Sequence, residues 1–338
     1  MSIRIEDFCT YAPKSDIKAG EASKEGQYMF FTSSEDESKR YTDYQFDGEG
    51  IIMGTGGNAT LHYYNGKYAV STDCIVLIPD NRVRCKYLYY FFLANMHILE
   101  AGVKGAGLKH TNKKYIGSIE LAVIPSLQEQ DEVIKILDKV SGVIKGRGLE
   151  SSALDDLIKA RFVEMFFDKG YPVLQWNDVF NTTTGKLDSN AMVENGEYPF
   201  FTCAKEVFRI DKYAFDQEAL LLAGNNAAGK YDVKYYKGKF NAYQRTYVLG
   251  LKQNWSYRLF QYQLEDKLVY LQQQSLGGLT KYLTMKILGE LSFIIPPMDK
   301  QIEFEQFVQQ VDKSKVVVQK AIDELHLLFD SLLQMYFE

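Results

Sequence analysis

A glycine-containing pentapeptide, FDGEG at Phe46–Gly50, is the first stretch whose residue types and spacing suggest chemistry. It has the F-x-G-x-G form with which methyltransferases that bind S-adenosylmethionine open their cofactor site, although a lone pair of glycines is a weak signal. The residues after it follow a β-hairpin pattern instead of the strand, turn and helix that such a site needs. We therefore assign no cofactor to this stretch.

The other catalytic motifs are incomplete. A DNA adenine methyltransferase holds its flipped base with an Asn/Asp-Pro-Pro-aromatic tetrad, but the double proline of Ile295–Met298 lacks both the polar residue and the aromatic ring. The Gly-Lys pairs at 185–186 and 229–230 are followed by Leu187 and Tyr231 instead of the Ser or Thr of a phosphate-binding loop. The sequence therefore predicts a chain without catalytic residues.

The cysteines and histidines are scattered and show no metal-ligand spacing. We interpret Cys9, Cys74, Cys85 and Cys203 as reduced, mostly buried thiols of a cytoplasmic protein. Apolar runs stay far below the ~20 residues that span a bilayer, and the N-terminus lacks the layout of a signal peptide. These features predict neither a metal site nor a membrane partner.

The length of 338 residues, with 46% hydrophobic composition, suffices for two ordinary domains. Residues 294–301, IIPPMDKQ, repeat the sequence motif of residues 123–130, VIPSLQEQ, 171 positions earlier. The same offset, within one residue, relates GQYMFFT to GEYPFFT, YYNGKY to YYKGKF and AGLK to GGLT. The chain is therefore predicted to consist of two similar units.

Each unit ends in a stretch of helical period. From Phe304 to Tyr336, nine of the ten positions spaced by alternating steps of four and three are apolar, and seven of the ten are apolar from Val133 to Met165. This spacing is typical of a coiled-coil seam, and about 36 residues would give rods on the order of 55 Å. We predict that the rods pair with each other; independent packing of each rod on its own domain is the alternative. Gly142, Gly146 and Gly148 are expected to bend or interrupt the first rod.

The remaining parts are short aromatic and β-branched runs that indicate strands. Asn65-Gly66 and Lys237-Gly238 have the flanking residues of tight hairpin turns, and helices are expected around residues 86–102 and 257–274. The predicted class is α+β, with antiparallel or mixed sheets. The predicted domains are heads at 1–122 and 169–293 and rods at 123–168 and 294–338.

Charge separates heads from rods. The chain carries −5 overall, and the rods carry −3 and −4. A protein that binds DNA unaided is usually basic. The balance disfavours a solitary high-affinity DNA binder but permits a DNA reader whose partners supply phosphate-binding charge.

The order and duplication of these elements resemble the specificity subunit of type I restriction-modification systems. The resemblance rests on the G-x-Y-x-F-F-T strand, the Tyr-Tyr-x-Gly-Lys motif, the Gly-Leu-Lys/Thr loop and the Ile-Pro-x-x-x-x-Gln helix entry, each present twice. It implies two target-recognition domains held apart by two long antiparallel helices with a pseudo-two-fold axis. Each domain would read one half of a split, asymmetric site in double-stranded DNA, and the helices would set the gap between the halves.

The resemblance also implies partners. Two methyltransferase subunits would bring S-adenosylmethionine, and an ATP-driven restriction subunit would use Mg²⁺, whereas this chain would bind no cofactor. The sequence departs from the family in its short length and in lacking, near Met1, a counterpart of Trp176. A recognition subunit of a type IIB-like enzyme and a scaffold that binds proteins instead of DNA are therefore alternatives.

The resemblance requires side chains that read base edges through paired donors and acceptors. Turn chemistry also favours Asn beside Gly, and a solvated basic loop is the alternative for the lysines. The candidate DNA-contacting residues are Asn58, Lys67, Lys109, His110, Thr111 and Lys113 in the first unit, and Asn225, Asn226, Lys230, Gln244, Arg245, Lys281 and Tyr282 in the second.

Overall fold

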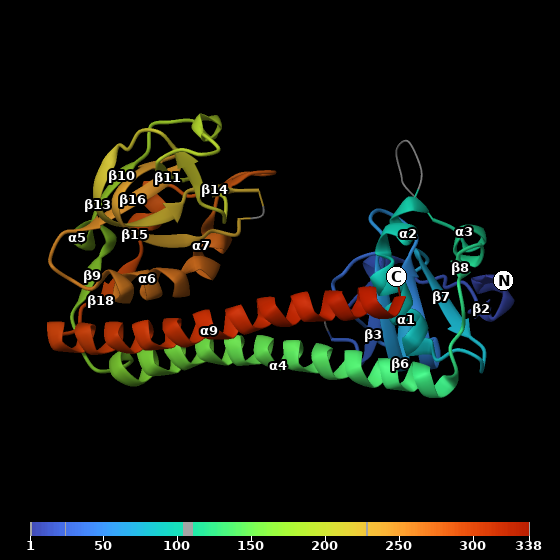
Figure 1. Ribbon diagram of the computed structural model, residues 1–338. Coiled ribbons are helices and arrows are strands. Elements are labelled where there is room, and N and C mark those ends of the chain that lie inside the picture. The colour runs from blue at the N-terminus through green and yellow to red at the C-terminus, as the bar shows by residue number, and fades with distance from the viewer. Residues whose placement is uncertain (1, 24, 104–110, 228, 338) are drawn as a thin grey trace. The chain divides into compact units, whose positions relative to one another are not determined.

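The computed structural model describes residues 2–23, 25–103, 111–227 and 229–337 (Figure 1). It divides into two compact units. Unit 1 contains residues 1–149 together with 318–338, and unit 2 contains residues 150–317. Each unit therefore combines a mixed head with parts of two long helices, α4 (Leu127–Phe166) and α9 (Met298–Phe337).

The head of unit 1 is built on a mixed sheet of the order β2-β7-β5-β6-β3-β4. All described neighbours are antiparallel except β3 and β6, which are parallel. The strands are β2 (Cys9–Tyr11), β3 (Tyr28–Phe31), β4 (Arg40–Tyr41), β5 (Phe46–Gly54), β6 (Leu61–Val70) and β7 (Cys74–Pro79), and β1 (Ile3–Arg4) pairs separately with β8 (Glu120–Leu121). The helices are α1 (Cys85–Ala94), α2 (Met96–Ala101) and α3 (Lys113–Gly117), and the 3₁₀ turns are η1 (Ile5–Asp7) and η2 (Ala19–Glu21).

The head of unit 2 repeats this topology in the order β10-β16-β13-β15-β11-β12. The strands are β10 (Phe180–Thr184), β11 (Tyr198–Phe201), β12 (Phe208–Ile210), β13 (Phe215–Ala223), β15 (Val233–Ala242) and β16 (Thr246–Leu251). Two further pairs are β9 (Val173–Gln175) with β18 (Ser292–Ile294), and β14 (Asn225–Asn226) with β17 (Lys281–Tyr282). The helices are α5 (Trp176–Val179), α6 (Tyr257–Asp266), α7 (Leu268–Gln274) and α8 (Met285–Gly289), and the 3₁₀ turn is η3 (Ser189–Ala191). The predicted tandem α+β class is confirmed.

The predicted hairpin turns at Asn65-Gly66 and Lys237-Gly238 are wrong. Both pairs lie inside long strands, β6 and β15, where Gly66 has φ +139° and Gly238 has φ +129°. Residues with a Cβ rarely adopt such angles, so glycine permits a sharp bend there. Phe31 accordingly pairs with Val70 near one end of β6, while its ring lies 5.2 Å from that of His62 near the other.

Both faces of each sheet are buried. Successive residues of β5 alternate between two cores, with Ile51 and Met53 on the helix side and Ile52 on the other. In β13, Leu220 and Leu222 likewise face the helices, whereas Leu221 packs on the opposite side. This is the period of two that strands impose on side chains. Burial on both faces explains why these strands read as nearly continuous apolar runs.

The helices expected after each sheet are present, although each is divided in two. In unit 1 the break between α1 and α2 falls at Asn95, whose side chain bonds the Phe91 carbonyl at 3.0 Å. In unit 2 it falls at Lys267. Figure 1 shows α6 between its sheet and α9, and Leu259 on α6 packs against the long helices while Phe260 packs against the sheet.

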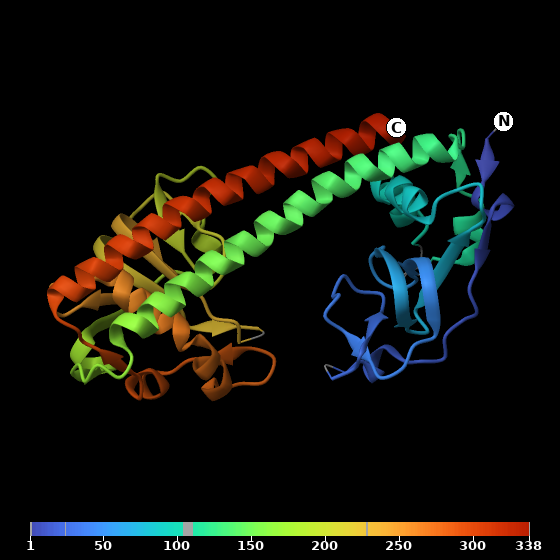
Figure 2. The ribbon, with the colours of Figure 1, turned by 90° about the horizontal axis from the view of Figure 1, so that it is seen from below.

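The two long helices pair in each unit. In unit 1, Leu137 of α4 clusters with Leu333 of α9, and in unit 2, Ile158 clusters with Val308 and Val311. Arg161 and Asp155 form ion pairs across unit 2 with Glu303 and Lys315, both at 2.6 Å. These contacts confirm the predicted pairing and show that the helices run in opposite directions within each unit (Figure 2). The long helices also pack on the head of each unit. The alternative, packing of each rod on a domain, therefore describes other contacts of the same helices. No helix among the described residues combines the length and apolar character needed to cross a bilayer.

The expected interruption of the first rod is wrong, because α4 is one continuous helix of 40 residues. Gly142, Gly146 and Gly148 are exposed on it, and a Cβ added at any of them would meet no atom within 4 Å. The hydrogen bonds of the surrounding helix therefore keep these glycines in helical conformation despite their low helix propensity.

Replacing Gly142 with alanine is expected to raise the free energy of unfolding by roughly 0.5–1 kcal/mol, because alanine loses less backbone entropy in a helix and the site has room for its methyl group. Urea denaturation followed by circular dichroism measures the change. Replacing the exposed Ala153 on the same helix with glycine should lower the free energy of unfolding by a similar amount. A lower stability for Gly142→Ala would contradict this account.

A buried glutamine explains the sequence motif that is repeated at the start of each long helix. Gln130 accepts a hydrogen bond from the Arg84 amide at 2.7 Å and donates to the carbonyls of Arg82 and Pro125. Gln301 accepts from the Ser256 amide at 3.0 Å and donates to the Pro296 carbonyl at 2.8 Å. Each glutamine thereby joins the proline turn, the start of a head helix and the long helix.

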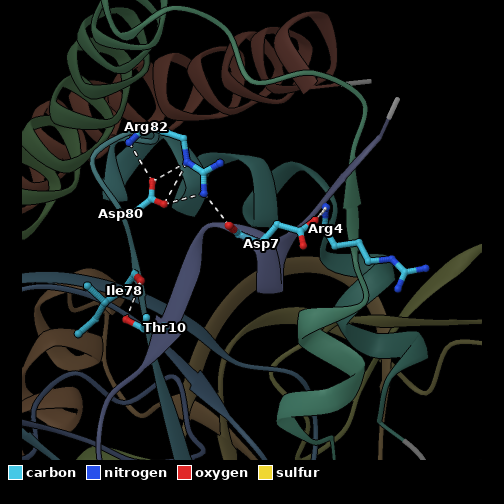
Figure 3. Close-up of polar contacts among 6 residues, drawn as sticks. All are labelled: Arg4, Asp7, Thr10, Ile78, Asp80 and Arg82. Atoms are coloured by element: carbon cyan, nitrogen blue, oxygen red, sulfur yellow. Dashed lines mark hydrogen bonds and ion pairs between the residues drawn. The ribbon is translucent and has the colours of Figure 1, made fainter.

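The start of each head is fixed in a similar way. Ile5 and Trp176 are fully buried and donate backbone bonds of 2.9 Å to Ile119 and Leu291, so Ile5 occupies the place of Trp176. Figure 3 shows how η1 is tied to the segment after β7: the Arg82 guanidinium donates to the Asp7 carbonyl at 2.5 Å and to the Asp80 carboxylate. The difference that the sequence shows at Trp176 is therefore a substitution at an equivalent core position.

Candidate nucleic-acid interface

Three loops converge at the end of β5 in unit 1. The Thr55 amide donates to the Asp73 carbonyl at 2.8 Å, and the Thr111 amide donates to the Thr55 carbonyl at 3.0 Å. Thr55 follows β5, Asp73 precedes β7, and Thr111 stands just before α3. We call this meeting point the three-loop junction of unit 1.

Unit 2 has the same junction. The Gly224 amide donates to the Arg245 carbonyl at 2.9 Å, and the Leu283 amide donates to the Gly224 carbonyl at 2.8 Å. The register of the strands agrees, because Gly54 lies opposite Cys74 in unit 1 as Ala223 lies opposite Thr246 in unit 2. All of these bonds join backbone atoms, so neither junction depends on the exposed side chains at the tips of its loops.

In unit 2 the junction continues into a short two-stranded ribbon formed by β14 and β17. Asn225 lies opposite Tyr282, and Asn226 lies opposite Lys281. The Lys230 amide donates to the Asn226 side-chain oxygen at 3.3 Å. Opposed residues of an antiparallel pair project to the same face. The ribbon therefore presents Asn225 with Tyr282 on one face and Asn226 with Lys281 on the other.

The other two candidates of unit 2 lie beside this ribbon. Gln244 and Arg245 form the exposed tip of the turn before β16, and the Arg245 carbonyl belongs to the junction. The Gln244 amide group donates to Asp188 at 3.4 Å. The structure thus brings the candidate residues of unit 2, which come from three loops, to one end of the sheet.

The candidates of unit 1 are more dispersed. Asn58 is exposed in the loop between β5 and β6, and Thr111 belongs to the junction. Lys113 begins α3, with its ammonium group 5.1 Å from the centre of the Tyr11 ring. Lys67 lies in β6, outside the three loops, and its ammonium group is 4.4 Å from the Tyr44 ring, whose hydrogen bond raises the lysine pKa. Lys109 and His110 lie outside the described residues.

A cavity of about 330 Å³ adjoins the junction of unit 1. Lys14, Thr72 and Lys113 line it on its polar side, and Cys74 and Val76 line it on its apolar side. Burial raises the pKa of the Cys74 thiol to about 11, so the thiol stays protonated and neutral. The cavity therefore combines two exposed ammonium groups with an uncharged floor.

The partly buried Tyr247 supports the junction of unit 2. The Tyr247 hydroxyl donates to the Leu283 carbonyl at 3.1 Å, and burial raises the pKa of Tyr247 and of Tyr231. A neutral phenol is the form that can donate such a bond. Among the residues that the structure describes, no group of three or more His, Cys, Asp or Glu side chains is arranged to hold a metal ion.

Sequence reasoning missed Thr55, Asp73 and the turn that Asp73 shares with Thr72. A signal was available, because Asp73 directly precedes the CIVLIP strand as Arg245 precedes the TYVLGL strand. Carrying the repeat offset from Gln244 and Arg245 back to unit 1 leads to Thr72 and Asp73. Of the four cysteines, Cys9, Cys74 and Cys85 are buried as expected, and Cys203 is partly exposed.

Comparison with known proteins places the chain in a family. The family model for the type I restriction modification DNA specificity domain matches residues 1–148 and 169–326. The EcoDI type I restriction enzyme specificity subunit of Escherichia coli is 34% identical over 152 residues, which cover 43% of this chain and 33% of that protein. The MpnII specificity subunit of Mycoplasma pneumoniae is 34% identical over 112 residues, 32% of this chain and 33% of that protein. The matched stretches thus span about a third of these relatives.

Solved structures agree with the fold. The S subunit of a type I restriction-modification system from M. genitalium has a TM-score of 0.64 at 15% identity, covering 100% of this chain and 96% of that one. A chain from a study of complex assembly and conformational transition of the type I R-M system has a TM-score of 0.51 at 14% identity, with 100% and 97% covered. Since the family model matches both units, the chain belongs to the type I restriction-modification DNA specificity family.

Proposed function

We propose that the chain is the DNA-reading subunit of a type I restriction-modification complex and performs no chemistry itself. Family membership supports this role, and the observation that carries it is the three-loop junction, present once in each head. A rigid sheet that supports variable polar loops is a common arrangement for binding residues. Side chains with paired donors and acceptors at such loops can read base edges in a groove.

The proposed target is a split, asymmetric site. Thr55, Asp73 and Thr111 of one junction differ in chemistry from Gly224, Arg245 and Leu283 of the other. Since base readout depends on the donor and acceptor pattern of the side chains, two unlike junctions should read unlike half-sites. The proposed recognition domains are the heads at 1–122 and 169–293, and the proposed helical regions are 123–168 and 294–338.

The proposed contacts are the thirteen residues identified from the sequence. We favour direct base contacts for Asn225, Asn226 and Arg245, because amide and guanidinium groups match adenine and guanine edges. Lysines such as Lys113 and Lys281 suit phosphates, which position the protein without sequence information. The net charge of −5 supports a complex in which other subunits supply much of the phosphate-binding charge.

The proposed partners follow from this role. Two methyltransferase subunits would carry S-adenosylmethionine, and a restriction subunit would use ATP and Mg²⁺, while this chain holds no cofactor. A recognition subunit of a type IIB-like enzyme would instead pair with a fused nuclease-methyltransferase. The composition of the complex purified with a tag on this chain distinguishes the two assemblies.

Deletion of the gene for this chain is expected to abolish N6-methyladenine at one split, asymmetric motif in its host. Single-molecule methylome sequencing of the host, the deletion strain and a complemented strain measures this. The neighbouring methyltransferase gene stays intact in all three strains, so a loss of methylation reports recognition. Methylation of the same motif in the deletion strain would refute the proposal, as would methylation by the purified chain with S-adenosylmethionine alone.

A further inference from the structure

The two heads carry the same tight turn at their junctions. In unit 1, residues Ser71–Cys74 close with a bond from the Cys74 amide to the Ser71 carbonyl at 3.1 Å. In unit 2, residues Tyr243–Thr246 close with the corresponding bond at 2.8 Å. Both turns are also held to the neighbouring strand, because the amides of Ser71 and Tyr243 donate to the carbonyls of Phe31 and Phe201, both at 2.8 Å.

The third residue of each turn is anchored by its backbone and exposes its side chain. The carbonyls of Asp73 and Arg245 accept the junction bonds from Thr55 and Gly224, and both side chains are exposed. Neither the carboxylate of Asp73 nor the guanidinium of Arg245 forms an ion pair with another described side chain. One backbone site thus presents opposite charges in the two heads, and folding uses neither charge.

We infer that this turn position reads one base in each half-site, with Arg245 selecting a guanine and Asp73 selecting a cytosine. The inference rests on the proposed function and adds the base classes. A guanidinium can donate two bonds to the O6 and N7 acceptors of guanine, whereas a carboxylate is an acceptor that suits the N4 amino group of cytosine. A bidentate contact also explains an arginine instead of a lysine at position 245.

A carboxylate near DNA is repelled by phosphates, and the surroundings of Asp73 offset this repulsion. Thr72, the neighbour of Asp73 in the turn, lines the cavity that also contains Lys14 and Lys113. Both lysines are exposed. Their ammonium groups can bind the phosphates on either side of the base that Asp73 selects, since lysine acts on phosphate as a point charge.

Two amide variants test the assignment. Arg245→Gln should change one position of the unit 2 half-site from guanine to adenine, and Asp73→Asn should change one position of the unit 1 half-site from cytosine to adenine, because an amide pairs with the adenine N6 and N7 edge. Each variant should lose roughly 5- to 150-fold in affinity for the original site. Methylome sequencing of cells that carry each variant with the native partner genes reads the base change directly.

The half-site of the unaltered head is the internal control in each experiment. Asp211→Asn, an exposed carboxylate between β12 and β13, should leave the motif unchanged. A motif that stays the same in both amide variants would overturn the inference, as would uniformly weaker methylation with no change of base. If the wild-type chain directs no methylation at a split motif, the proposed function itself fails, and that outcome is seen before any variant is made.

Discussion

Replacing Gln130 with leucine is expected to lower the free energy of unfolding of unit 1 by roughly 3 to 5 kcal/mol. The side chain is fully buried and serves three backbone groups, the Arg84 amide and the carbonyls of Arg82 and Pro125. Leucine fills a similar volume but leaves all three without that partner, and each unsatisfied buried group costs about 1–3 kcal/mol. The change belongs among the severe single substitutions because one residue serves three chain segments.

Hydrogen exchange measures this effect locally, since a chain of two units need not unfold in one step. The Arg84 amide should lose protection in the Gln130→Leu variant. Gln128→Leu is the matched control, because Gln128 is exposed on the same helix and bonds only Glu132, at 3.5 Å, among the contacts described for its side chain. Equal loss of protection in both variants would show that the buried bonds are not the cause.

Replacing Gly224 with alanine is expected to disrupt the junction of unit 2 and to cost about 3 kcal/mol. An added Cβ would lie 2.3 Å from the Arg245 carbonyl oxygen and 3.0 Å from the Tyr247 ring. Backbone atoms must then move, which strains the core and weakens the bonds from Gly224 to Arg245 and Leu283. If recognition of the unit 2 half-site requires this junction, the affinity of the complex for DNA with that half-site should fall roughly 150-fold.

Binding of DNA by the purified complex, measured with duplexes altered in one half-site at a time, tests this prediction. Discrimination within the unit 2 half-site should be lost and discrimination within the unit 1 half-site retained. Gly278→Ala is the matched control, because a Cβ there would meet nothing within 4 Å although the residue lies in the loop before β17. Full discrimination by Gly224→Ala would show that the loops are positioned by other contacts.

The long helices were predictable because their pattern repeats over many turns. A seam of apolar residues at helical spacing from Phe304 to Tyr336 leaves few other ways to bury those side chains. The glycines of α4 were harder to interpret. Propensity treats Gly142 as a helix breaker, but the neighbouring turns of the helix and the seam contact of Leu137 with Leu333 outweigh a cost of about 1 kcal/mol.

The hairpin error has a different physical cause. Asn-Gly between aromatic residues favours a turn when only neighbours along the chain are considered. In the folded head, Asn65 pairs with Glu49 and Gly66 pairs with Gly48, so a partner strand continues past the expected turn. The glycine is still needed for its positive φ, but it bends a strand instead of reversing one.

The candidate interface was predictable only in part. Residue types identified Asn225, Asn226 and Arg245, but their meeting with Lys281 depends on pairing between segments that are distant in sequence. Asp73 was missed because an acidic residue is not an obvious ligand for a polyanion. The backbone bonds of the two units place Asp73 at the position equivalent to Arg245.

The backbone construction of the junctions also bears on how this chain can acquire new targets. Amide and carbonyl groups hold the loops together, so substitutions at their exposed tips leave the scaffold bonds in place. If the junctions read bases as proposed, recognition can drift one base at a time without a folding penalty. Because each head has its own junction, two independently altered heads would then generate combinations of half-sites, and a small number of tip variants would supply a large repertoire of DNA targets.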